Sequence, residues 1–201
     1  MKNIFKSLLL AAIIAPMAVS CVQDDDTVLP PYTPLLLAED FNKGADNSLL
    51  DIPGWLNFAS EGTALWKIQR YSGNGYAEFT TYQSGEASNV GWLVSPEVTL
   101  EEGNTKTLVF EVSQSYVSSA ANKLEVFIST NFDGTNVAGA TWVPLSANIP
   151  GTNATYFEFQ DSGEIDLSAY NGPAHIAFKV TGSGTNTALD GSYQIDNVNI
   201  Y

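Results

Sequence analysis

The fold of this chain is decided by its stretch Gly191-Ser-Tyr-Gln-Ile-Asp-Asn-Val-Asn-Ile-Tyr201, which reads as a β-strand with one irregularity. Two apolar pairs alternate with polar residues along it, Tyr193 with Ile195 and Val198 with Ile200. The first pair would point to one face of a strand, and the second pair to the other face. A shift of one residue between two such sets indicates a β-bulge at Asp196-Asn197. We expect this strand to be paired within a sheet, so that the fold closes around it.

Short alternating stretches of the same kind precede it, separated by turns rich in Gly, Asn and Ser. Ser72-Gly73-Asn74-Gly75 predicts a hairpin, Ile52-Pro53-Gly54-Trp55 a turn, and Ser95-Pro96 the end of a strand. The expected strands are 35–42, 64–70, 75–82, 90–100, 105–116, 123–130, 141–145, 155–160, 172–181 and 191–201. No stretch keeps a helical period. The sequence therefore predicts an all-β protein, a jelly-roll-like antiparallel β-sandwich of two packed sheets.

The N-terminus carries the features of a secretory signal peptide. Lys2 and Lys6 precede an apolar run of 12 residues, 8–19, which is shorter than the about 20 residues of a transmembrane helix. Cys21 is the only cysteine, so an intramolecular disulfide is excluded. Ala18-Val19-Ser20-Cys21 resembles the lipobox of bacterial lipoproteins, although Val19 stands where a small residue is commoner. We predict a signal peptide over 1–20 and lipidation at Cys21; the alternative is a plain signal peptide with a free cysteine.

Residues 21–34 are predicted to form a tether between the lipid and a single β-sandwich domain, 35–201. The tether contains the acidic run Asp24-Asp25-Asp26, followed by prolines at 30, 31 and 34. The acidic run is either a solvated spacer or, by its resemblance to the export signal of some Gram-negative lipoproteins, a signal for surface display. We expect the second, which places a monomeric body outside the outer membrane and leaves the lipid anchor as the only membrane contact.

Charge narrows the possible partners. The chain has 22 acidic and 8 basic residues, and removing 1–20 takes away Lys2 and Lys6. The remaining 6 basic and 22 acidic residues give a net charge of −16. Such a surface repels nucleic acid and makes divalent cations plausible ligands.

Eight segments, taken in order, resemble one family. They are Glu39-Asp40-Phe41, Pro53-Gly54-Trp55, Gly91-Trp92-Leu93-Val94-Ser95-Pro96, Leu124-Glu125-Val126-Phe127-Ile128-Ser129-Thr130, Ala140-Thr141-Trp142, Ile165-Asp166-Leu167-Ser168-Ala169-Tyr170, Ile176-Ala177-Phe178-Lys179 and Ile195-Asp196-Asn197-Val198. Their order and spacing resemble the choice-of-anchor J, or cleaved-adhesin, domains, which are jelly-roll sandwiches akin to galactose-binding and MAM domains. The resemblance covers nearly all of 35–201. It implies a surface or secreted bacterial module that is not an enzyme in itself, and several such modules bind structural calcium.

A calcium ion needs several hard oxygen ligands, and the sequence contains no EF-hand loop. Jelly-roll domains often bring such ligands together from their first and last strands. We therefore predict structural Ca²⁺ at Asp40 and Asp196, with Glu39 as the third ligand. The alternative is that Glu39 and Asp40 are strand-edge charges that oppose aggregation, and that Asp196 is a solvent-side residue at the bulge.

Aromatic residues near expected loop ends are candidates for ligand contact. They are Trp66, Tyr71, Tyr76, Tyr82 and Tyr116. Exposed rings of this kind form stacking platforms for sugar rings; the alternative is that they cover the edges of the core. Trp92 and Trp142 are expected in the core or between the sheets, and Trp55 is expected to plug a turn.

The sequence predicts no catalytic residues. His175 is the only histidine and alternates with Ile176 and Phe178, so we expect it on the surface, and no Cys or His set for zinc is present. A carboxylate pair for glycoside hydrolysis is a spatial feature that spacing does not exclude. However, no acid lies in an apolar sequence context.

We therefore expect a non-catalytic, surface-anchored lipoprotein that acts as a binding or adhesion module for glycan or protein. The alternatives are a glycan-processing enzyme accessory or hydrolase, and a structural surface component. Clustered aromatic residues on one face would favour glycan binding, a buried acid pair in a cleft would favour the hydrolase, and an apolar patch would favour assembly.

Overall fold

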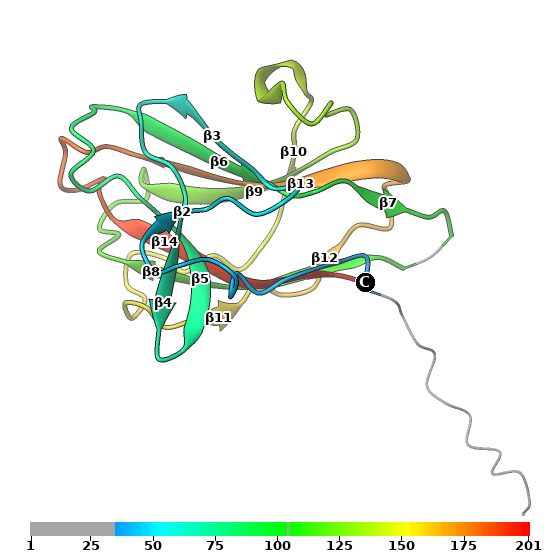
Figure 1. Ribbon diagram of the computed structural model, residues 1–201, viewed down its shortest axis with the longest axis horizontal. Helices are drawn as coiled ribbons and strands as arrows, with labels where there is room; N and C mark the ends of the chain where they lie inside the picture. Colours follow the sequence, from blue (N-terminus) through cyan, green and yellow to red (C-terminus); the bar gives the residue numbers. More distant parts are fainter. Residues whose placement is uncertain (1–34, 104) are drawn as a thin grey trace, which may run out of the picture. The chain divides into compact units, whose positions relative to one another are not determined.

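Two antiparallel β-sheets pack face to face in this protein, one above the other in the view of Figure 1. The computed structural model describes residues 35–103 and 105–201, which belong to one compact unit. The predicted all-β sandwich is confirmed, and the one helical element of the described residues is a 3-10 turn, η1 (Val137–Gly139). The predicted signal peptide, Cys21 and the tether lie outside these residues. Within the described ranges, no helix is long and apolar enough to cross a membrane.

The larger sheet has eight strands, and the last strand of the chain lies in its interior. In order across the sheet they are β11 (Gln160–Asp161), β8 (Thr107–Ser115), β14 (Ser192–Ile200), β5 (Asn74–Thr80), β4 (Lys67–Tyr71) and β2 (Ser48–Leu49). In addition, β1 (Leu37–Glu39) pairs with β14, and β12 (Ile165–Asp166) pairs with β8. The first and last strands are therefore neighbours, as the sequence predicted.

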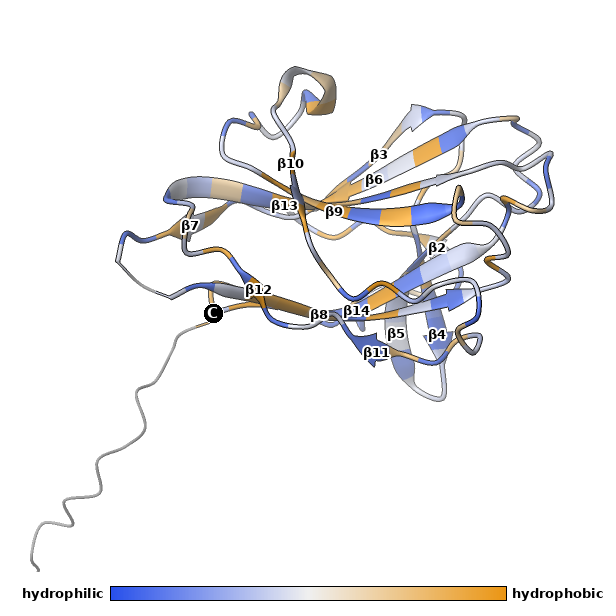
Figure 2. Ribbon diagram, turned by 180° about the vertical axis from the view of Figure 1, so that it is seen from behind, coloured by the Kyte–Doolittle hydropathy of each residue, from blue (hydrophilic) through white to orange (hydrophobic). Residues whose placement is uncertain are grey.

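The smaller sheet has six strands. In order they are β10 (Val143–Leu145), β9 (Lys123–Ser129), β13 (Gly172–Gly182), β6 (Asn89–Val94) and β3 (Leu56–Glu61), with β7 (Val98–Leu100) also paired to β13. The predicted break at Ser95-Pro96 separates β6 from β7. Hydropathy alternates over the first half of β9 in Figure 2, because Leu124 and Val126 face the other sheet while Lys123 and Glu125 face outward.

The bulge predicted in the last strand is confirmed. The register of β14 against β8 shifts between Asp196 and Asn199, and Asn197 has a φ of 49°. The extra residue turns the second apolar pair back toward the core, so that all four apolar side chains of the strand are buried. Asp196 is only 1% exposed, so the expectation of a solvent-side residue at this position is wrong.

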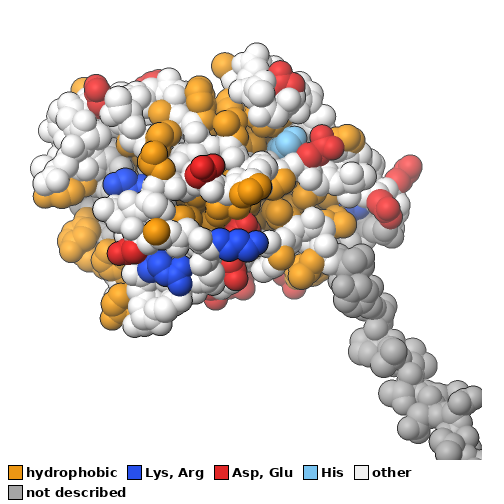
Figure 3. All heavy atoms as spheres, viewed as in Figure 1, with side chains coloured by type: hydrophobic (Ala, Val, Ile, Leu, Met, Phe, Trp, Pro, Cys, Tyr) orange, Lys and Arg blue, Asp and Glu red, His pale blue; other side chains and the backbone are white. Residues whose placement is uncertain are grey.

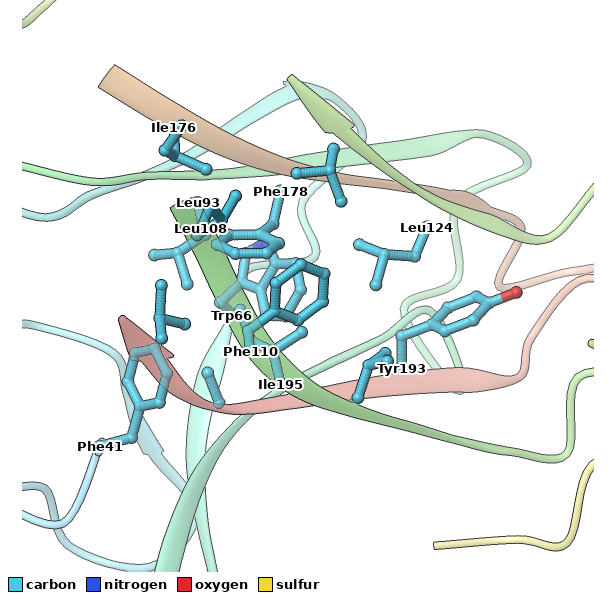
Figure 4. Packing of buried hydrophobic residues seen from close by; sticks show 14 of the residues in the cluster. Phe41, Trp66, Leu93, Leu108, Phe110, Leu124, Ile176, Phe178, Tyr193 and Ile195 are labelled. Carbon is cyan, nitrogen blue, oxygen red and sulfur yellow. The ribbon is translucent and has the colours of Figure 1, made fainter. Parts of the chain in front are cut away.

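The core lies between the sheets and is rich in aromatic rings. Phe110 and Phe178 meet edge to face with their centroids 5.0 Å apart, and Figure 4 shows Trp66 beside Phe110. Trp66 is 0% exposed, and its ring centroid lies 5.5 Å from that of Phe79. Burying a large side chain in this way contributes about 1.5–3 kcal/mol, and the chain has no disulfide to add to it.

A second apolar cluster lies on the outer face of the smaller sheet. Trp92 and Trp142 lie here, with their ring centroids 5.4 Å apart, and Phe132 packs on Trp142. Phe132 also packs on His175, which is only 7% exposed and bonds through Nδ1 to the Ser95 carbonyl oxygen at 2.8 Å. The expectation of a surface histidine was wrong, because the loop that carries Phe132 covers the outer face of β13.

The sequence also predicted a strand at 155–160 that the structure does not contain. Residues 151–159 form an irregular loop, and only β11 follows it. Phe157 has a φ of 58°, which ends any extended run at that point. Conversely, β2 and β3 were not predicted. The strand β2 has only two residues, and β3 is interrupted by a register shift between Ala59 and Glu61.

Candidate functional site

The candidate site is a cavity of about 610 Å³ on the outer face of the larger sheet. Ala77 and Phe79 of β5 point into the core, so the alternate residues Tyr76, Glu78 and Thr80 point outward. Pairing brings the outer faces of β14 and β8 alongside, with Ser192 opposite both Thr80 and Ser115. The cavity therefore lies where β5 and β8 end and β14 begins.

Glu78, Ser192 and Ser115 line the base of the cavity, and Gln194 and Ser113, both 0% exposed, lie beneath them. These side chains form one hydrogen-bonded set that we call the polar floor. The Gln194 amide donates to Glu78 Oε2 at 2.8 Å and to Ser192 Oγ at 2.7 Å, and Gln194 Oε1 accepts from Ser113 Oγ at 2.7 Å. The hydroxyls of Ser115 and Ser192 are 2.6 Å apart. Because each member holds the next, the floor presents a fixed pattern of donors and acceptors.

Burial raises the pKa of the Glu78 carboxyl, although hydrogen bonds from Gln194 and Ser192 oppose that shift. Asp190 lines the same cavity. The sequence had given no sign of an acid with a raised pKa, because the burial of Glu78 arises from neighbouring strands and loops rather than from adjacent residues.

Aromatic side chains form the walls. Tyr116 and Tyr82 are 62% and 61% exposed, values that leave most of each ring free for a ligand. Tyr116 packs against Tyr156 with centroids 4.7 Å apart and against Phe157 at 6.4 Å. Tyr116 and Phe157 both have positive φ values, 59° and 58°. Such backbone strain in residues other than glycine concentrates at functional sites.

The buried side chain and backbone of Gln114 hold both the loop that carries Tyr156 and the turn that carries Tyr116. The Gln114 amide donates to the Ala154 carbonyl oxygen at 2.7 Å, and Gln114 Oε1 accepts from Val117 N at 3.0 Å. The Gln114 backbone carbonyl also accepts from Phe157 N at 2.9 Å. The loop that carries Tyr156 and the turn that carries Tyr116 are thus tied to the end of β8.

Two further cavities adjoin the central one. The Tyr71 cavity, of about 540 Å³, is lined by Tyr71, Asn74, Tyr76, Phe157 and Phe159, and it shares Phe157 with the central cavity. The Lys67 cavity, of about 420 Å³, shares Glu78, Thr80 and Tyr82 with it. We call the three together the aromatic groove.

The structure brings four of the five predicted ligand residues to this groove: Tyr71, Tyr76, Tyr82 and Tyr116. Trp66 was predicted with them, but it is fully buried in the core and has no surface on which a ligand could stack. Trp66 and Ile68 are two residues apart and so share one face of an extended chain, and this spacing could have shown that Trp66 is buried with Ile68. The groove residues of the loop, Tyr156, Phe157 and Phe159, were missed because that loop had been predicted as a strand.

The predicted metal ligands lie near one another but are not arranged as a three-carboxylate site. Asp196 accepts hydrogen bonds from Asn74 Nδ2 and from Asn197 N, both at 2.7 Å. Burial raises the pKa of Asp196, and the charges of Glu111 and Asp40 raise it further.

The carboxylates of Asp40 and Glu39 each accept a hydrogen bond from a backbone amide two residues ahead. In the described residues, no group of three or more His, Cys, Asp or Glu side chains is placed to hold a metal. Calcium binding stays a prediction.

Comparison with known proteins gives a family and a fold. Residues 67–200 match a family described as "Domain of unknown function (DUF5017)", and no curated protein sequence matches the chain. Three solved structures with a similar fold are cleaved adhesin domains of Lys-gingipain from Porphyromonas gingivalis.

The K3 domain is 21% identical, with a TM-score of 0.54 over 84% of this chain and 99% of that one. The K2 domain is 14% identical, with a TM-score of 0.55 over 82% and 98%. The K1 domain is 20% identical, with a TM-score of 0.52 over 82% and 96%.

Proposed function

This chain belongs to the DUF5017 family, a domain of unknown function. We propose that it is a glycan-binding module whose ligand lies in the aromatic groove. One observation carries the proposal. Exposed tyrosines surround a cavity whose base is a fixed set of hydrogen-bonding side chains. Rings stack on the apolar faces of sugars while polar side chains bind the hydroxyls, so the two together suit a carbohydrate.

A protein ligand is the other form of the binding hypothesis. Tyrosine-rich surfaces also bind proteins. The groove favours a glycan because the base of its central cavity is polar, with the Glu78 carboxylate and the Ser115 and Ser192 side chains in its lining, whereas the centre of a protein interface is depleted of charged residues.

The test uses the purified full chain on a glycan array, followed by calorimetry with each glycan that binds. Tyr116→Ala is expected to lower affinity at least about tenfold, which corresponds to about 1.4 kcal/mol. The matched control is Phe58→Ala, which removes an exposed ring from β3 of the other sheet. Equal losses in the two variants, or no loss in Tyr116→Ala, would contradict the proposal.

Glycan hydrolysis is the second candidate function, and one observation favours it. Glu78, a carboxyl whose pKa is raised by burial, lines the same cavity as Asp190. Glycosidases use one such acid with a second carboxylate. We favour binding without catalysis because Glu78 Oε2 already accepts a hydrogen bond from Gln194. Release of reducing ends from a bound glycan by the parent chain, lost in Glu78→Gln, would establish the hydrolase instead.

We also propose that the module is displayed on the cell surface by a lipid at Cys21, and that it is related to the choice-of-anchor J domains. Support for the anchor is the lipobox-like Ala18-Val19-Ser20-Cys21 and the acidic run after it. Support for the relationship is the fold shared with cleaved adhesin domains. Cys21→Ala is expected to release the protein from the membrane fraction. Replacing Asp24, Asp25 and Asp26 by Ala should keep it there but protect it from external protease.

A further inference from the structure

The three cavities of the aromatic groove adjoin through shared wall residues, which bears on the size of the ligand. Phe157 belongs to the walls of both the central and the Tyr71 cavities, and Glu78 to the walls of both the central and the Lys67 cavities. Each cavity exceeds the about 300 Å³ at the lower end of small-molecule pockets. One sugar ring would fill a fraction of the groove, whereas an extended chain could cross it.

Aromatic rings are present along the groove and not only at its centre. In the Tyr71 cavity, Tyr76 packs edge to face on Phe159 at 5.6 Å, and Tyr71 is 77% exposed. In the central cavity, Tyr116 and Tyr156 form the second ring pair. Phe157, which is half exposed, lies between the two sets. Two aromatic sets joined in this way provide separate stacking positions for successive sugar units.

The charges of the groove bear on the chemistry of the ligand. Among the described residues that line the three cavities, the acids are Glu78 and Asp190 and the one base is Lys67. Glu78 is the charged residue common to the central and Lys67 cavities, and burial opposes its ionised form. An anionic sugar placed over it would add a second negative charge in a site of low dielectric. On the face drawn in Figure 3, basic side chains form only scattered spots, so that view shows no broad patch that would attract an anion.

The polar floor, in turn, suits hydroxyl groups. A carboxylate offers about four acceptor positions. Glu78 Oε2 accepts from Gln194 at 2.8 Å and from Ser192 at 3.5 Å, which leaves acceptor capacity on the side chain. Ser115 and Ser192 are only 1% and 6% exposed, and their hydroxyls already bond to each other and to Gln194, so Glu78 is the floor residue with capacity to spare. A neutral sugar satisfies Glu78 through its hydroxyls without bringing a charge.

We propose that the groove binds an uncharged oligosaccharide chain that crosses all three cavities, and that Glu78 both accepts hydrogen bonds from its hydroxyls and excludes anionic glycans. This inference rests on the proposed glycan-binding function and specifies its ligand class. It assigns Tyr116 to the central position and Tyr71 to a flanking one, so that only longer ligands contact both.

The experiment is calorimetry of the full chain with two sets of probes at physiological ionic strength, where surface charges beyond about 8 Å are screened. The neutral set contains cello-, xylo-, manno- and chito-oligosaccharides of one to six units. The anionic set contains oligogalacturonates and heparin fragments of matched length. We expect affinity to rise with length in at least one neutral series, and anionic probes to bind at least about tenfold more weakly than any neutral probe that binds.

Variants separate the two parts of the proposal. Tyr71→Ala should weaken the longest neutral probe and leave the shortest one that binds unaffected, whereas Tyr116→Ala should weaken both. Glu78→Gln, which keeps the shape and removes the charge, should raise anionic binding at least about tenfold; Asp190→Asn tests the same effect if Glu78→Gln unfolds. Phe58→Ala serves as the control.

The outcomes distinguish this inference from the proposed function. If anionic probes bind as tightly as neutral ones, or if affinity does not depend on length, the inference fails while glycan binding stands. If no probe of either set binds, both fail.

Discussion

Glu78 is the residue on which the account of the site depends most. It points away from the core on β5, where it is half-buried, and desolvation raises the pKa of its carboxyl. A raised pKa in the folded state means that ionisation is less favourable there than in the unfolded chain. The ionised carboxyl therefore lowers stability at neutral pH, and this cost disappears as pH falls through the raised pKa.

The first prediction compares Glu78→Gln with the parent across pH. The variant carries no titrating group at this position, so it should be more stable relative to the parent at pH 7 than at pH 4. Denaturant melts at both values measure the difference, and the comparison cancels the other carboxylates. Asp166→Asn is the control, because hydrogen bonds from Ser168 lower the pKa of Asp166. This variant should therefore be less stable relative to the parent at pH 7 than at pH 4. A constant difference between Glu78→Gln and the parent would refute the burial of an ionised Glu78.

At the scale of single elements, β14 organises the larger sheet. It pairs with β8, β5 and β1, and its bulge returns Val198 and Ile200 to the core. The bulge depends on Asn197, whose φ of 49° lies in the left-handed region that β-branched residues avoid.

The second prediction follows from that angle. Asn197→Val should destabilise the domain by about 1–2 kcal/mol, the cost of a left-handed conformation for an L-residue with a Cβ. Asn197→Gly, which adopts this φ freely, should remain within about 0.5 kcal/mol of the parent. Denaturant unfolding of both variants measures the two values. Equal destabilisation would mean that the Asn197 side chain, and not the backbone angle, sets the bulge.

The loop 151–159 is the element that forms the site, and Gln114 holds it. The third prediction is that Gln114→Ala weakens glycan binding without removing any groove residue, because the walls that carry Tyr116 and Tyr156 are no longer tied together. It should also cost about 1–3 kcal/mol of stability for each buried partner left unpaired.

The control for this prediction is Gln160→Ala. It also removes an amide that donates to a backbone carbonyl oxygen, that of Asn148 at 3.0 Å, but Gln160 is exposed. Calorimetry at a temperature where all variants are folded should show a loss of affinity for Gln114→Ala alone. Unchanged affinity in Gln114→Ala would show that the aromatic walls hold their own positions.

Elements with local signals were predictable from sequence, and those set by distant contacts were not. The bulge of β14 follows from its own alternation, and the hairpin between β4 and β5 from Ser72-Gly73, whose φ values are 51° and 92°. In 155–160 the sequence Thr-Tyr-Phe-Glu-Phe-Gln has the composition of a strand. The hydrogen bond from Phe157 N to the Gln114 carbonyl oxygen, which is distant in the sequence, accompanies a loop instead. Trp66 differs from this loop, because its burial could have been predicted locally from its spacing of two residues from Ile68, which is also buried.

For the whole molecule, the main functional feature is that exposed aromatic side chains gather in one groove, which also contains the carboxylates of Glu78 and Asp190. The sequence predicted an acidic, aromatic-rich sandwich and named four tyrosines of the groove. It could not show that Glu78, Gln194 and Ser192 meet, because β5 and β14, which are far apart in the sequence, must first pair with Gln194 opposite Glu78.

The fourth prediction concerns calcium and the total charge. If Asp196 and Asp40 bind the ion, calcium at 100 times its dissociation constant adds about 2.7 kcal/mol and should raise the Tm by several degrees. Sodium at matched ionic strength controls for general screening, and Asp196→Asn should abolish the difference. The same Tm in calcium and sodium would leave Asp196 as a buried acceptor for Asn74 and Asn197.

The central claim is that a glycan binds over the polar floor, and the Gln194 side-chain amide is its most direct reporter. We would follow this signal by NMR while titrating the full chain with the tightest neutral probe. We expect the Gln194 side-chain amide signal to shift in proportion to saturation. The Trp92 indole N–H, which bonds to Ser60 on the smaller sheet, should not move. A moving Trp92 signal with a stationary Gln194 signal would place the ligand on the other face and contradict the account.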